Sequence, residues 1–313
     1  MKKVIAGTDI GGTNTEIGLV DYDGKICERL TISSKGYESF EDFIDFLSEK
    51  ILDSVDGGGY DLTGIGVGAA NGNFFKGTIE YAANLEWEGV LPVADLLSKK
   101  TGVPVKVTND ANAAASGEKI YGKASGIDDF VMITLGTGLG SGIFAGGKLL
   151  YGHDGFAGEL GHVRVKDDGR ECGCGRKGCL ETYVSATGLL RTAKEILSET
   201  DEYSLMRNAD LKNMQSKDVY KFAVGGDPAA LRAFDFTAEI LGKALADFTA
   251  VLNPEYFFFF GGLANAGDLL LKPAEKYMND NLMTVYKNKV KLAVSGLKPG
   301  EAAILGASAL MHE

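Results

Sequence analysis

The sequence predicts an α/β protein built from two similar halves, with a ligand-binding cleft between them. A buried strand at residues 4–9 leads into the turn Gly11-Gly12-Thr13, and a hairpin follows this turn. The same succession returns at residues 130–135, where an apolar strand leads into a glycine-rich turn and another short strand. Such a repeat indicates a duplicated unit. Because hairpins precede alternating strands and helices, we expect mixed sheets covered by helices. Ligands commonly bind between such halves.

Hydrophobic periodicity gives the order of the elements. Strands are predicted at residues 4–9, 16–20, 25–31, 64–69, 103–108, 130–135, 257–260 and 290–294. Helices are predicted at residues 39–52, 185–199, 229–252, 267–282 and 301–312, and an alanine-rich helix is predicted directly after Asn109-Asp110. We expect one domain over residues 1–115, joined by the C-terminal helix at about residues 298–313, and a larger domain over residues 116–297.

Composition and charge exclude several classes of protein. The 313 residues are enough for two domains with proper cores. A net charge of −11 argues against a general nucleic-acid surface. The charged start of the sequence does not match a signal peptide, and the apolar run at residues 256–260 is too short to cross a bilayer. We therefore expect a cytoplasmic protein with no nucleic-acid partner and no membrane partner.

Three of the four cysteines lie within eight residues, at Cys172, Cys174 and Cys179, and His162 precedes them by ten positions. Three thiolates and one imidazole can fill the four corners of a tetrahedral Zn²⁺ site. A site with no open position organises structure and does not activate water. The alternatives are a disulfide with a spare thiol, or a glycine-rich surface turn. Clustered cysteines in an intracellular protein favour the metal.

The 43 glycines are about twice the usual share, and they cluster at strand ends. In the turn after the first strand, Asp9 precedes Gly11, Gly12 and Thr13. Bare backbone N–H groups in such a turn can surround phosphate oxygens, and the carboxylate can hold hydrated Mg²⁺. The alternative is an ordinary hairpin turn. The near-repeat at Gly136-Thr137-Gly138-Leu139-Gly140 favours two turns that bind one polyphosphate.

Asn109 and Asp110 lie between a predicted strand and a predicted helix. Either side chain could cap that helix. Together with the two glycine turns, the position favours Asp110 as a general base acting on a hydroxyl group.

A further set of polar residues surrounds the predicted metal. Glu159, His162 and Glu181 bracket the cysteines, so a bound metal would draw them together into a rigid group able to recognise hydroxyls. The alternative is that the two acids are merely solvated. Asn71 is a further candidate for binding hydroxyls. We expect core packing for Trp87, and Cys27 is expected to be a small core residue.

These motifs together resemble the ROK family (repressors, open reading frames, kinases) over nearly the whole chain. The segments at residues 9–13, 108–112, 135–140, 158–162 and 172–181 occur in the family's order. The metal motif is the most specific of them, whereas the glycine turns are shared with all actin-like ATPases. The resemblance implies the actin-like ATPase (ribonuclease H-like) fold with two duplicated domains and an interdomain cleft. It also implies a homodimer or a higher homo-oligomer.

The resemblance implies a role for each motif residue. Asp110 corresponds to the catalytic base. The ligands of the sugar hydroxyls correspond to Asn109, Asp110, Glu159, His162 and Glu181, and the zinc ligands correspond to His162, Cys172, Cys174 and Cys179. The phosphate contacts correspond to Gly11, Gly12, Thr13, Gly136, Thr137 and Gly138, and the adenosine side corresponds to Gly261, Gly262 and Leu263. Asp9, the carboxylate that can hold Mg²⁺, completes the cofactor-binding set. One departure matters, because many members have Pro-Gly where this chain has Ala70-Asn71.

The predicted activity is transfer of the γ-phosphoryl group of ATP, with Mg²⁺, to the 6-hydroxyl of glucose. The substitution that places Asn71 at this position is similar to that in a subset of glucokinases. It leaves the exact hexose open. An N-acetylmannosamine kinase is the nearest alternative, and a non-catalytic sugar-binding protein is a more distant one. A sugar-responsive repressor of the same family would carry a DNA-binding segment ahead of Asp9, for which we expect no room. Polyphosphate in place of ATP stays open as the donor.

Overall fold

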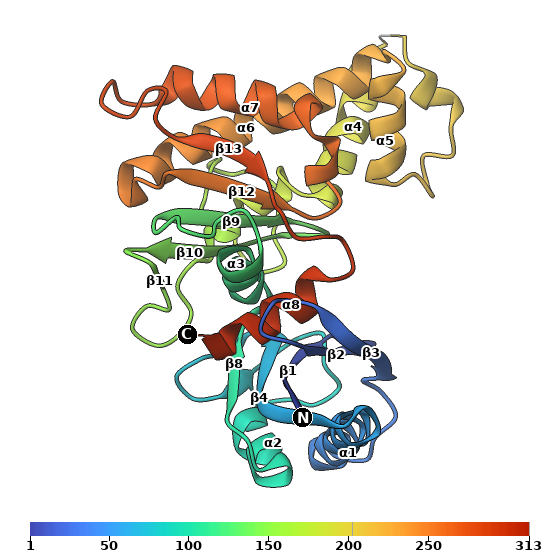
Figure 1. Cartoon of the computed structure of the whole chain (residues 1–313). Helices are drawn as coiled ribbons and strands as arrows, with labels where there is room; N and C mark the ends of the chain where they lie inside the picture. Colours follow the sequence, from blue (N-terminus) through green and yellow to red (C-terminus); the bar gives the residue numbers. More distant parts are fainter. Residues whose placement is uncertain (202, 313) are drawn as a thin grey trace. The chain divides into compact units, whose positions relative to one another are not determined.

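The computed structural model describes residues 1–201 and 203–312 (Figure 1). The strands are β1 Lys2–Ile10, β2 Asn14–Val20, β3 Ile26–Ser33, β4 Tyr60–Ala69, β5 Gly72–Asn73, β6 Thr78–Glu80, β7 Val90–Leu91, β8 Val105–Thr108, β9 Phe130–Leu135, β10 Leu139–Ala145, β11 Lys148–Leu149, β12 Tyr256–Phe260 and β13 Lys291–Val294. The α-helices are α1 Phe40–Gly58, α2 Val93–Thr101, α3 Asp110–Tyr121, α4 Ala186–Glu199, α5 Ser216–Val224, α6 Pro228–Leu252, α7 Asp268–Asn281 and α8 Ala302–Ala309. The predicted mixed α/β class is confirmed.

The first sheet has the strand order β3-β2-β1-β4-β8. The strands β1, β2 and β3 form antiparallel hairpins, whereas β4 runs parallel to both β1 and β8. The carboxyl ends of β1, β4 and β8 therefore lie at one edge of the sheet.

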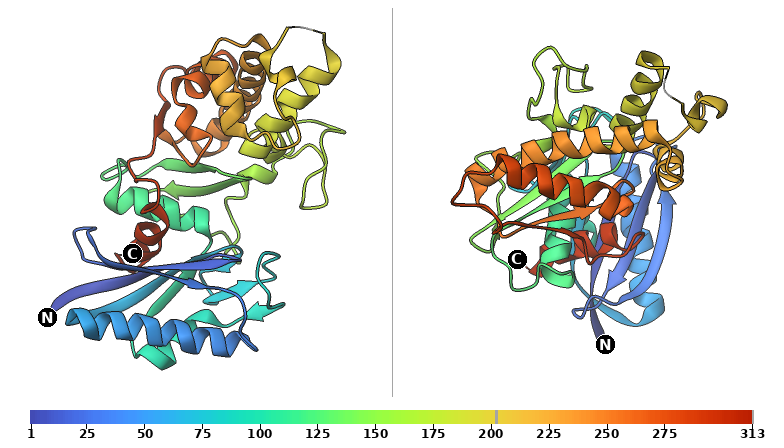
Figure 2. Two further views of the ribbon diagram at one scale, coloured as in Figure 1. Left: turned by 90° about the vertical axis from the view of Figure 1, so that its right-hand side faces the viewer. Right: turned by 90° about the horizontal axis from the view of Figure 1, so that it is seen from above.

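Helices cover both faces of this sheet (Figure 2). One face is covered by α1, whose apolar side buries Phe43, Ile44 and Leu47. Trp87 stacks on Phe43 with ring centroids 5.1 Å apart, so its predicted role in core packing is confirmed. Cys27 also packs against this core.

The other face of the first sheet is covered by α8, on which α3 packs in turn. Glycines make this close packing possible. A Cβ atom at Gly7 or Gly66 would overlap the backbone carbonyls of α8. At the crossing of the two helices, a Cβ on Gly117 would lie 2.9 Å from the Cα of Gly306. Part of the glycine excess therefore serves helix packing and not ligand binding.

The second sheet has the strand order β11-β10-β9-β12-β13, in which β12 runs parallel to β9 and β13. It thus repeats the order of the first sheet, with a hairpin on one side and two parallel strands on the other. The buried residues Phe257, Phe258 and Phe259 of β12 form part of its core. The helices α4, α5 and α7 pack against the long helix α6.

The chain divides into two compact units. Unit 1 comprises Met1–Asp128, Gly142–Gly158 and Ser295–Glu313, and unit 2 comprises Asp129–Ser141 and Glu159–Val294. Residues 116–128 and 142–158 thus belong to unit 1, whereas the sequence placed them in the larger second domain.

Most predicted elements are present, and the two helices that were not predicted share a common feature. The helices α2 and α5 and the small sheet β5-β6-β7 have no counterpart in the prediction. Each helix has only nine residues, and each buries only two of its residues. So few apolar positions do not establish a helical period.

Among the helices of residues 1–201 and 203–312, none combines the length and the apolar character that a membrane span requires.

Candidate active site

The strand ends of unit 1 bring two predicted acids together. In the register of the first sheet Asp9 lies beside Gly68, and Gly68 lies beside Thr108. A Cβ on Gly68 would lie 3.8 Å from an Asp9 carboxylate oxygen and 4.0 Å from the Cα of Asp110. A side chain at position 68 would therefore lie between the two acids, and glycine leaves that space free.

The carboxyl group of Asp9 lies in an unfavourable electrostatic environment. Burial and, to a smaller extent, the negative charges of Asp110 and Glu16 together raise its pKa to about 6. The charge of Glu16 is offset by Arg29, whose Nη2 lies 2.6 Å from a Glu16 oxygen. A site that disfavours a buried negative charge is one in which a cation would be stabilising.

The side chains of Asn109 and Asp110 take different roles at the start of α3. Asn109 is the N-cap, because its side-chain oxygen accepts the Asn112 backbone N–H at 2.7 Å. Asp110 is exposed, and one of its carboxylate oxygens accepts the Ala111 N–H at 2.8 Å. The structure therefore assigns the cap to Asn109 and leaves the Asp110 side chain exposed beside it.

Asn71 lies in a tight turn beside this helix start. Its backbone has a positive φ of 54°, a conformation that asparagine tolerates better than most residues. Its side-chain amide donates to the Tyr81 carbonyl at 3.3 Å. A Cβ on the next residue, Gly72, would lie 3.1 Å from the Asn109 nitrogen. The turn therefore packs closely against the junction of β8 and α3, next to Asn109.

The first glycine turn, residues 11–13, is closed by a hydrogen bond from the Gly11 N–H to the Asn14 carbonyl at 3.1 Å. A Cβ on Gly12 would overlap the Asn84 carbonyl, which packs against this turn. Thr13 is exposed, and its carbonyl accepts the Ser34 N–H at 2.9 Å. The turn is thus held on both sides while its hydroxyl residue stays accessible.

The second glycine turn, residues 136–138, belongs to unit 2 and is shorter than predicted, because β10 already begins at Leu139. The start of α4 holds it in place. The Ala186 N–H donates to the Gly136 carbonyl at 2.9 Å, and the Thr187 hydroxyl donates to the Thr137 carbonyl at 2.7 Å. Two hydrogen bonds from one helix end fix the conformation of this turn.

A third turn, residues 261–263, lies beside the second one. Since β12 runs parallel to β9, Phe260 pairs with Thr134 and both strands end at the same edge. The Leu263 N–H donates to the Leu135 carbonyl at 3.2 Å, and Gly261 has a positive φ of 102°. A Cβ at Gly261 would lie 2.6 Å from that same carbonyl, so only glycine fits there.

The predicted cysteine and histidine residues converge. One ligand atom from each of His162, Cys172, Cys174 and Cys179 lies within 4.8 Å of all the others, a grouping that could hold a metal ion. The Sγ atoms of Cys174 and Cys179 are 3.7 Å apart, and Nδ1 of His162 lies 3.6 Å from Sγ of Cys172. All four cysteines of the chain are free thiols, so the disulfide alternative is wrong.

The two predicted glutamates lie on opposite nitrogens of the same imidazole. Nε2 of His162 is 3.9 Å from a Glu159 oxygen, and Nδ1 is 3.6 Å from a Glu181 oxygen. That Glu181 oxygen also accepts the Cys172 thiol at 2.9 Å. The cluster and both acids therefore form one group within unit 2.

The thiols of the cluster differ in acidity. Hydrogen bonding to Arg176 lowers the pKa of Cys174 to about 6. Burial and the hydrogen bond to Glu181 raise the pKa of Cys172. Burial also raises the pKa of Cys179. Metal ligands must be thiolates, so ion binding would release protons mainly from the two buried thiols.

The second glycine turn and the cysteine cluster share one cavity of about 430 Å³. Thr137, Gly138, Cys172, Glu181 and Arg191 are among the residues that line it. A Cβ on Gly138 would lie 2.7 Å from a Glu181 oxygen, so the turn and this acid are in close contact.

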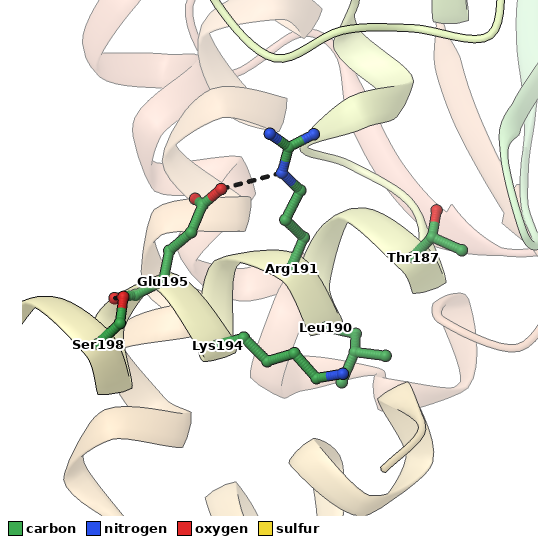
Figure 3. A pocket seen from close by; sticks show the side chains of 6 residues that line it. All are labelled: Thr187, Leu190, Arg191, Lys194, Glu195 and Ser198. Atoms are coloured by element: carbon green, nitrogen blue, oxygen red, sulfur yellow. Dashed lines mark hydrogen bonds and ion pairs between the residues drawn. The ribbon is translucent and has the colours of Figure 1, made fainter. Parts of the chain in front are cut away.

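A second cavity, of about 440 Å³, continues along α4 from the same helix start (Figure 3). Thr187 and Arg191 line both cavities. In the close view Arg191 extends toward Glu195, with Nε 2.9 Å from the carboxylate oxygen. The exposed positive charge of Arg191 therefore lies beside the cavity that the glycine turn enters.

Two buried side chains that support these groups were not identified from the sequence. Arg170 donates to the Thr182 carbonyl at 2.7 Å and to the Thr192 hydroxyl at 2.8 Å, and it pairs with Glu195. It thereby ties the cysteine segment to α4. In unit 1, the Asn73 amide donates to the Asp154 carbonyl at 2.8 Å. Neither residue belongs to a local motif, and the nearness of Arg170 to the cysteines was the only available signal.

Comparisons with known proteins agree with this arrangement. The model of the ROK family matches residues 5–313. A glucokinase from Thermotoga maritima is 35% identical over 316 residues, covering 100% of this chain and 98% of the relative. A xylose repressor from Caldicellulosiruptor bescii is 30% identical, and the match covers 98% of this chain and 77% of the repressor. Among solved structures, a ROK family glucokinase from Streptomyces griseus in complex with glucose and AMPPNP is 35% identical, with a TM-score of 0.78 and 98% of both chains covered. The family resemblance predicted from the motifs is confirmed, and the chain belongs to the ROK family.

Proposed function

We propose that this protein is an ATP-dependent hexose kinase that phosphorylates the 6-hydroxyl of glucose. The observation that carries the proposal is that two neighbouring side chains at the start of α3 have different roles. Asn109 caps the helix, which leaves the exposed Asp110 carboxylate available as a general base. The similarity to glucokinases over the full length of the chain supports the substrate and the donor.

In the proposed reaction Asp110 accepts the proton of the sugar hydroxyl as its oxygen attacks the γ-phosphorus of ATP in line. The backbone N–H groups of the two glycine turns surround the phosphate oxygens, with Thr13 and Thr137 supplying hydroxyls. Asp9 would hold hydrated Mg²⁺, which supplies positive charge for the transferring group. The raised pKa of Asp9 supports this assignment, because the unfavourable environment of its carboxylate is relieved by a cation.

The nucleoside part of ATP is assigned to the turn at residues 261–263. Gly261, Gly262 and Leu263 follow β12 directly and lie at the same edge of the sheet as the second glycine turn. This placement supports contact with one nucleotide from both turns.

The remaining polar groups are assigned to the sugar. The proposed ligands of its hydroxyls are Asn71, Asn109, Asp110, Glu159, His162 and Glu181. Within unit 1 the close packing of the Asn71 turn against Asn109 supports this set. Within unit 2 the convergence of both glutamates on His162 supports it.

The cluster of His162, Cys172, Cys174 and Cys179 is assigned to a structural Zn²⁺ ion. Ligands about 2.3 Å from a tetrahedral centre lie about 3.8 Å from one another. The Sγ separation of 3.7 Å between Cys174 and Cys179 agrees with that value. The ion would fix the imidazole through Nδ1, which leaves Nε2 to donate toward Glu159 or a sugar hydroxyl.

The proposal also covers the fold, the cellular location and the assembly state of the enzyme. The repeated strand order of the two sheets supports an actin-like ATPase fold with a duplicated domain. We propose that groups from both units act on the same pair of substrates, in a cytoplasmic enzyme that forms a homo-oligomer.

A panel of sugars tests the proposal. Purified protein is incubated with ATP and Mg²⁺ and with glucose, mannose, N-acetylmannosamine or xylose, and the phosphorylated product is identified by mass spectrometry. We expect glucose 6-phosphate at the highest kcat/KM, and a polyphosphate arm tests the donor. A higher kcat/KM for N-acetylmannosamine would favour the alternative kinase. Absence of product from every sugar and donor would refute the kinase function.

A further inference from the structure

Glu118 is a fully buried carboxylate in the last turn of α3, 0% exposed. It accepts hydrogen bonds from three donors. These are the Lys123 N–H at 2.8 Å, the Ser295 hydroxyl at 2.5 Å and the Gly296 N–H at 2.9 Å. We refer to Glu118, Lys123, Ser295 and Gly296 as the Glu118 cluster. One side chain thus satisfies donors from two segments that are more than 170 positions apart in the sequence.

Both segments belong to connections between the two units. Lys123 lies in the stretch that leaves α3 before unit 2 begins at Asp129. Ser295 is the first residue of unit 1 after unit 2 ends at Val294. The Glu118 carboxylate therefore holds the first stretch that leaves unit 1 and the last stretch that returns to it at the same place.

Two glycines allow the segments to approach closely. A Cβ on Gly122 would lie 2.5 Å from the Glu118 carboxylate. A Cβ on Gly296 would lie 3.0 Å from the Lys123 nitrogen and 3.3 Å from the Cα of Gly122. The two connections thus pack so closely around the carboxylate that positions 122 and 296 leave little room for a side chain, which restricts how the connections can move independently.

Stability alone does not account for a carboxylate at this position. A negative charge near a helix C-terminus is repelled by the helix dipole, and burying a carboxylate is costly unless every oxygen is hydrogen-bonded. Apolar packing would stabilise the same fold more simply. What an apolar side chain cannot do is set the position of three backbone and hydroxyl donors relative to α3.

We propose that Glu118 is a positioning residue for phosphoryl transfer, which fixes two of the four connections between the units to the helix that carries Asp110. This inference rests on the proposed kinase function. Glu118 lies eight residues after Asp110, about 12 Å along the same helix. Loosening the connections at one end of α3 therefore disturbs the placement of the base at its other end, without any contact between Glu118 and substrate.

The chain offers a matched control in Asp227. This carboxylate is 4% exposed and accepts a serine hydroxyl and two backbone N–H groups, from Ser204 at 2.9 Å, Leu205 at 2.6 Å and Ala230 at 3.0 Å. Its donors match those of Glu118 in kind and number, but they lie inside unit 2 and away from the points where the chain passes between the units. Asp227→Asn removes the same charge without touching a connection.

The test compares Glu118→Gln and Asp227→Asn with the wild type. We expect Glu118→Gln to lower kcat about tenfold, since small displacements of reacting groups are costly, while the KM for glucose changes less than about twofold. Hydrogen exchange should quicken in residues 122–128 and 294–298 together. Asp227→Asn should lower the free energy of unfolding by an amount comparable to that for Glu118→Gln. Its kcat should stay that of the wild type, and its hydrogen exchange should quicken only around the donors of Asp227.

Equal kcat in the two variants, or unchanged exchange in both connections of Glu118→Gln, would overturn the inference and leave Glu118 a purely structural residue. Ser295→Ala, which removes one donor, should act in the same direction with a smaller effect, and it serves as the test if Glu118→Gln does not fold. If the wild type phosphorylates no sugar, the kinase function is refuted instead. The hydrogen-exchange experiment then still decides whether the Glu118 cluster holds these two connections together.

Discussion

The two five-stranded sheets share one strand order but carry different chemistry at the turn that follows the first strand of each. After β1, the turn at residues 11–13 follows Asp9, whose pKa is raised to about 6 by burial and by neighbouring acids. After β9, the turn at residues 136–138 follows Leu135 and packs against Glu181 beside the cysteine cluster. One scaffold thus supports two different electrostatic environments.

The difference suggests separate roles in the proposed reaction for two sheets that have the same strand order. The first turn lies where a negative charge is destabilised, so a cation is favoured there. The second turn has no acid of its own and is held by the start of α4, which favours contact with phosphate and hydroxyl groups. Substitutions that remove one environment at a time test this division.

The largest effect is expected from Asp110→Asn. Loss of the general base should lower kcat by about 10²–10⁴-fold. The free energy of unfolding should change by less than about 0.5 kcal/mol, because the side chain is exposed and Asn109 keeps the cap. Steady-state kinetics and urea denaturation measure both quantities. Asp95→Asn, in the first turn of α2, is the control for losing an exposed acid at a helix start. Turnover near that of the wild type would show that Asp110 is not the base.

The next largest effect is expected from Cys179→Ser, which removes a buried ligand of the proposed zinc. The metal content should fall well below one ion per chain, and the KM for glucose should rise about 10–100-fold because His162 and Glu181 are no longer fixed. Elemental analysis and kinetics provide the two measurements. Cys27→Ser, outside the cluster, should change neither. A wild type without stoichiometric zinc would contradict the metal assignment.

A smaller effect, on stability, is expected from Asp9→Asn. The folded-state pKa of Asp9 is raised from 3.8 to about 6, so the folded state favours the protonated form. The stability that this preference contributes is complete below about pH 4 and is lost as the pH rises through about 6. Since each pKa unit corresponds to about 1.4 kcal/mol and the side chain keeps some solvent exposure, the variant should be more stable than the wild type by about 1–2 kcal/mol at pH 7.5.

Urea denaturation without Mg²⁺ or nucleotide, at about pH 7.5 and about pH 4, measures this difference. Mg²⁺ with ATP should reduce it at the higher pH, because a bound cation stabilises the wild-type carboxylate. A stability gain that is the same at both pH values would show that the charge of Asp9 is not its cause.

The smallest effect is expected from Gly138→Ala, which tests the contact between the second glycine turn and Glu181. The new methyl group would lie 2.7 Å from a Glu181 oxygen and must displace that side chain. We expect the KM for glucose to rise about fivefold with less change in kcat, since a partly displaced ligand weakens binding by about 1 kcal/mol. Gly57→Ala in α1, where no atom lies within 4 Å of the added Cβ, is the control. An unchanged KM for glucose would show that Glu181 is not a ligand of the sugar.

The sequence was most informative where function depends on residues that are close together in the chain. The spacing of Cys172, Cys174 and Cys179 predicted their convergence, and Asn109-Asp110 at a strand end predicted a helix start. It was least informative where partners are distant. The bonding of Glu118 to Ser295 spans 177 positions, and Arg170 reaches Thr192 and Glu195 on another element. No local pattern indicates such pairs.

By itself, the sequence determined the α/β class, the ROK family, the order of the main elements, and the identity of the motif residues. The class and the elements follow from periodicity along the chain, and the family follows from the resemblance of its motifs, so none of these requires knowledge of the tertiary structure. Only the tertiary structure decided that Asn109 and not Asp110 caps α3, that several glycines serve the packing of α8, and that Glu118 joins two connections. Each of these depends on which atoms lie within a few ångströms of one another, and that is fixed by packing between segments that are distant in sequence.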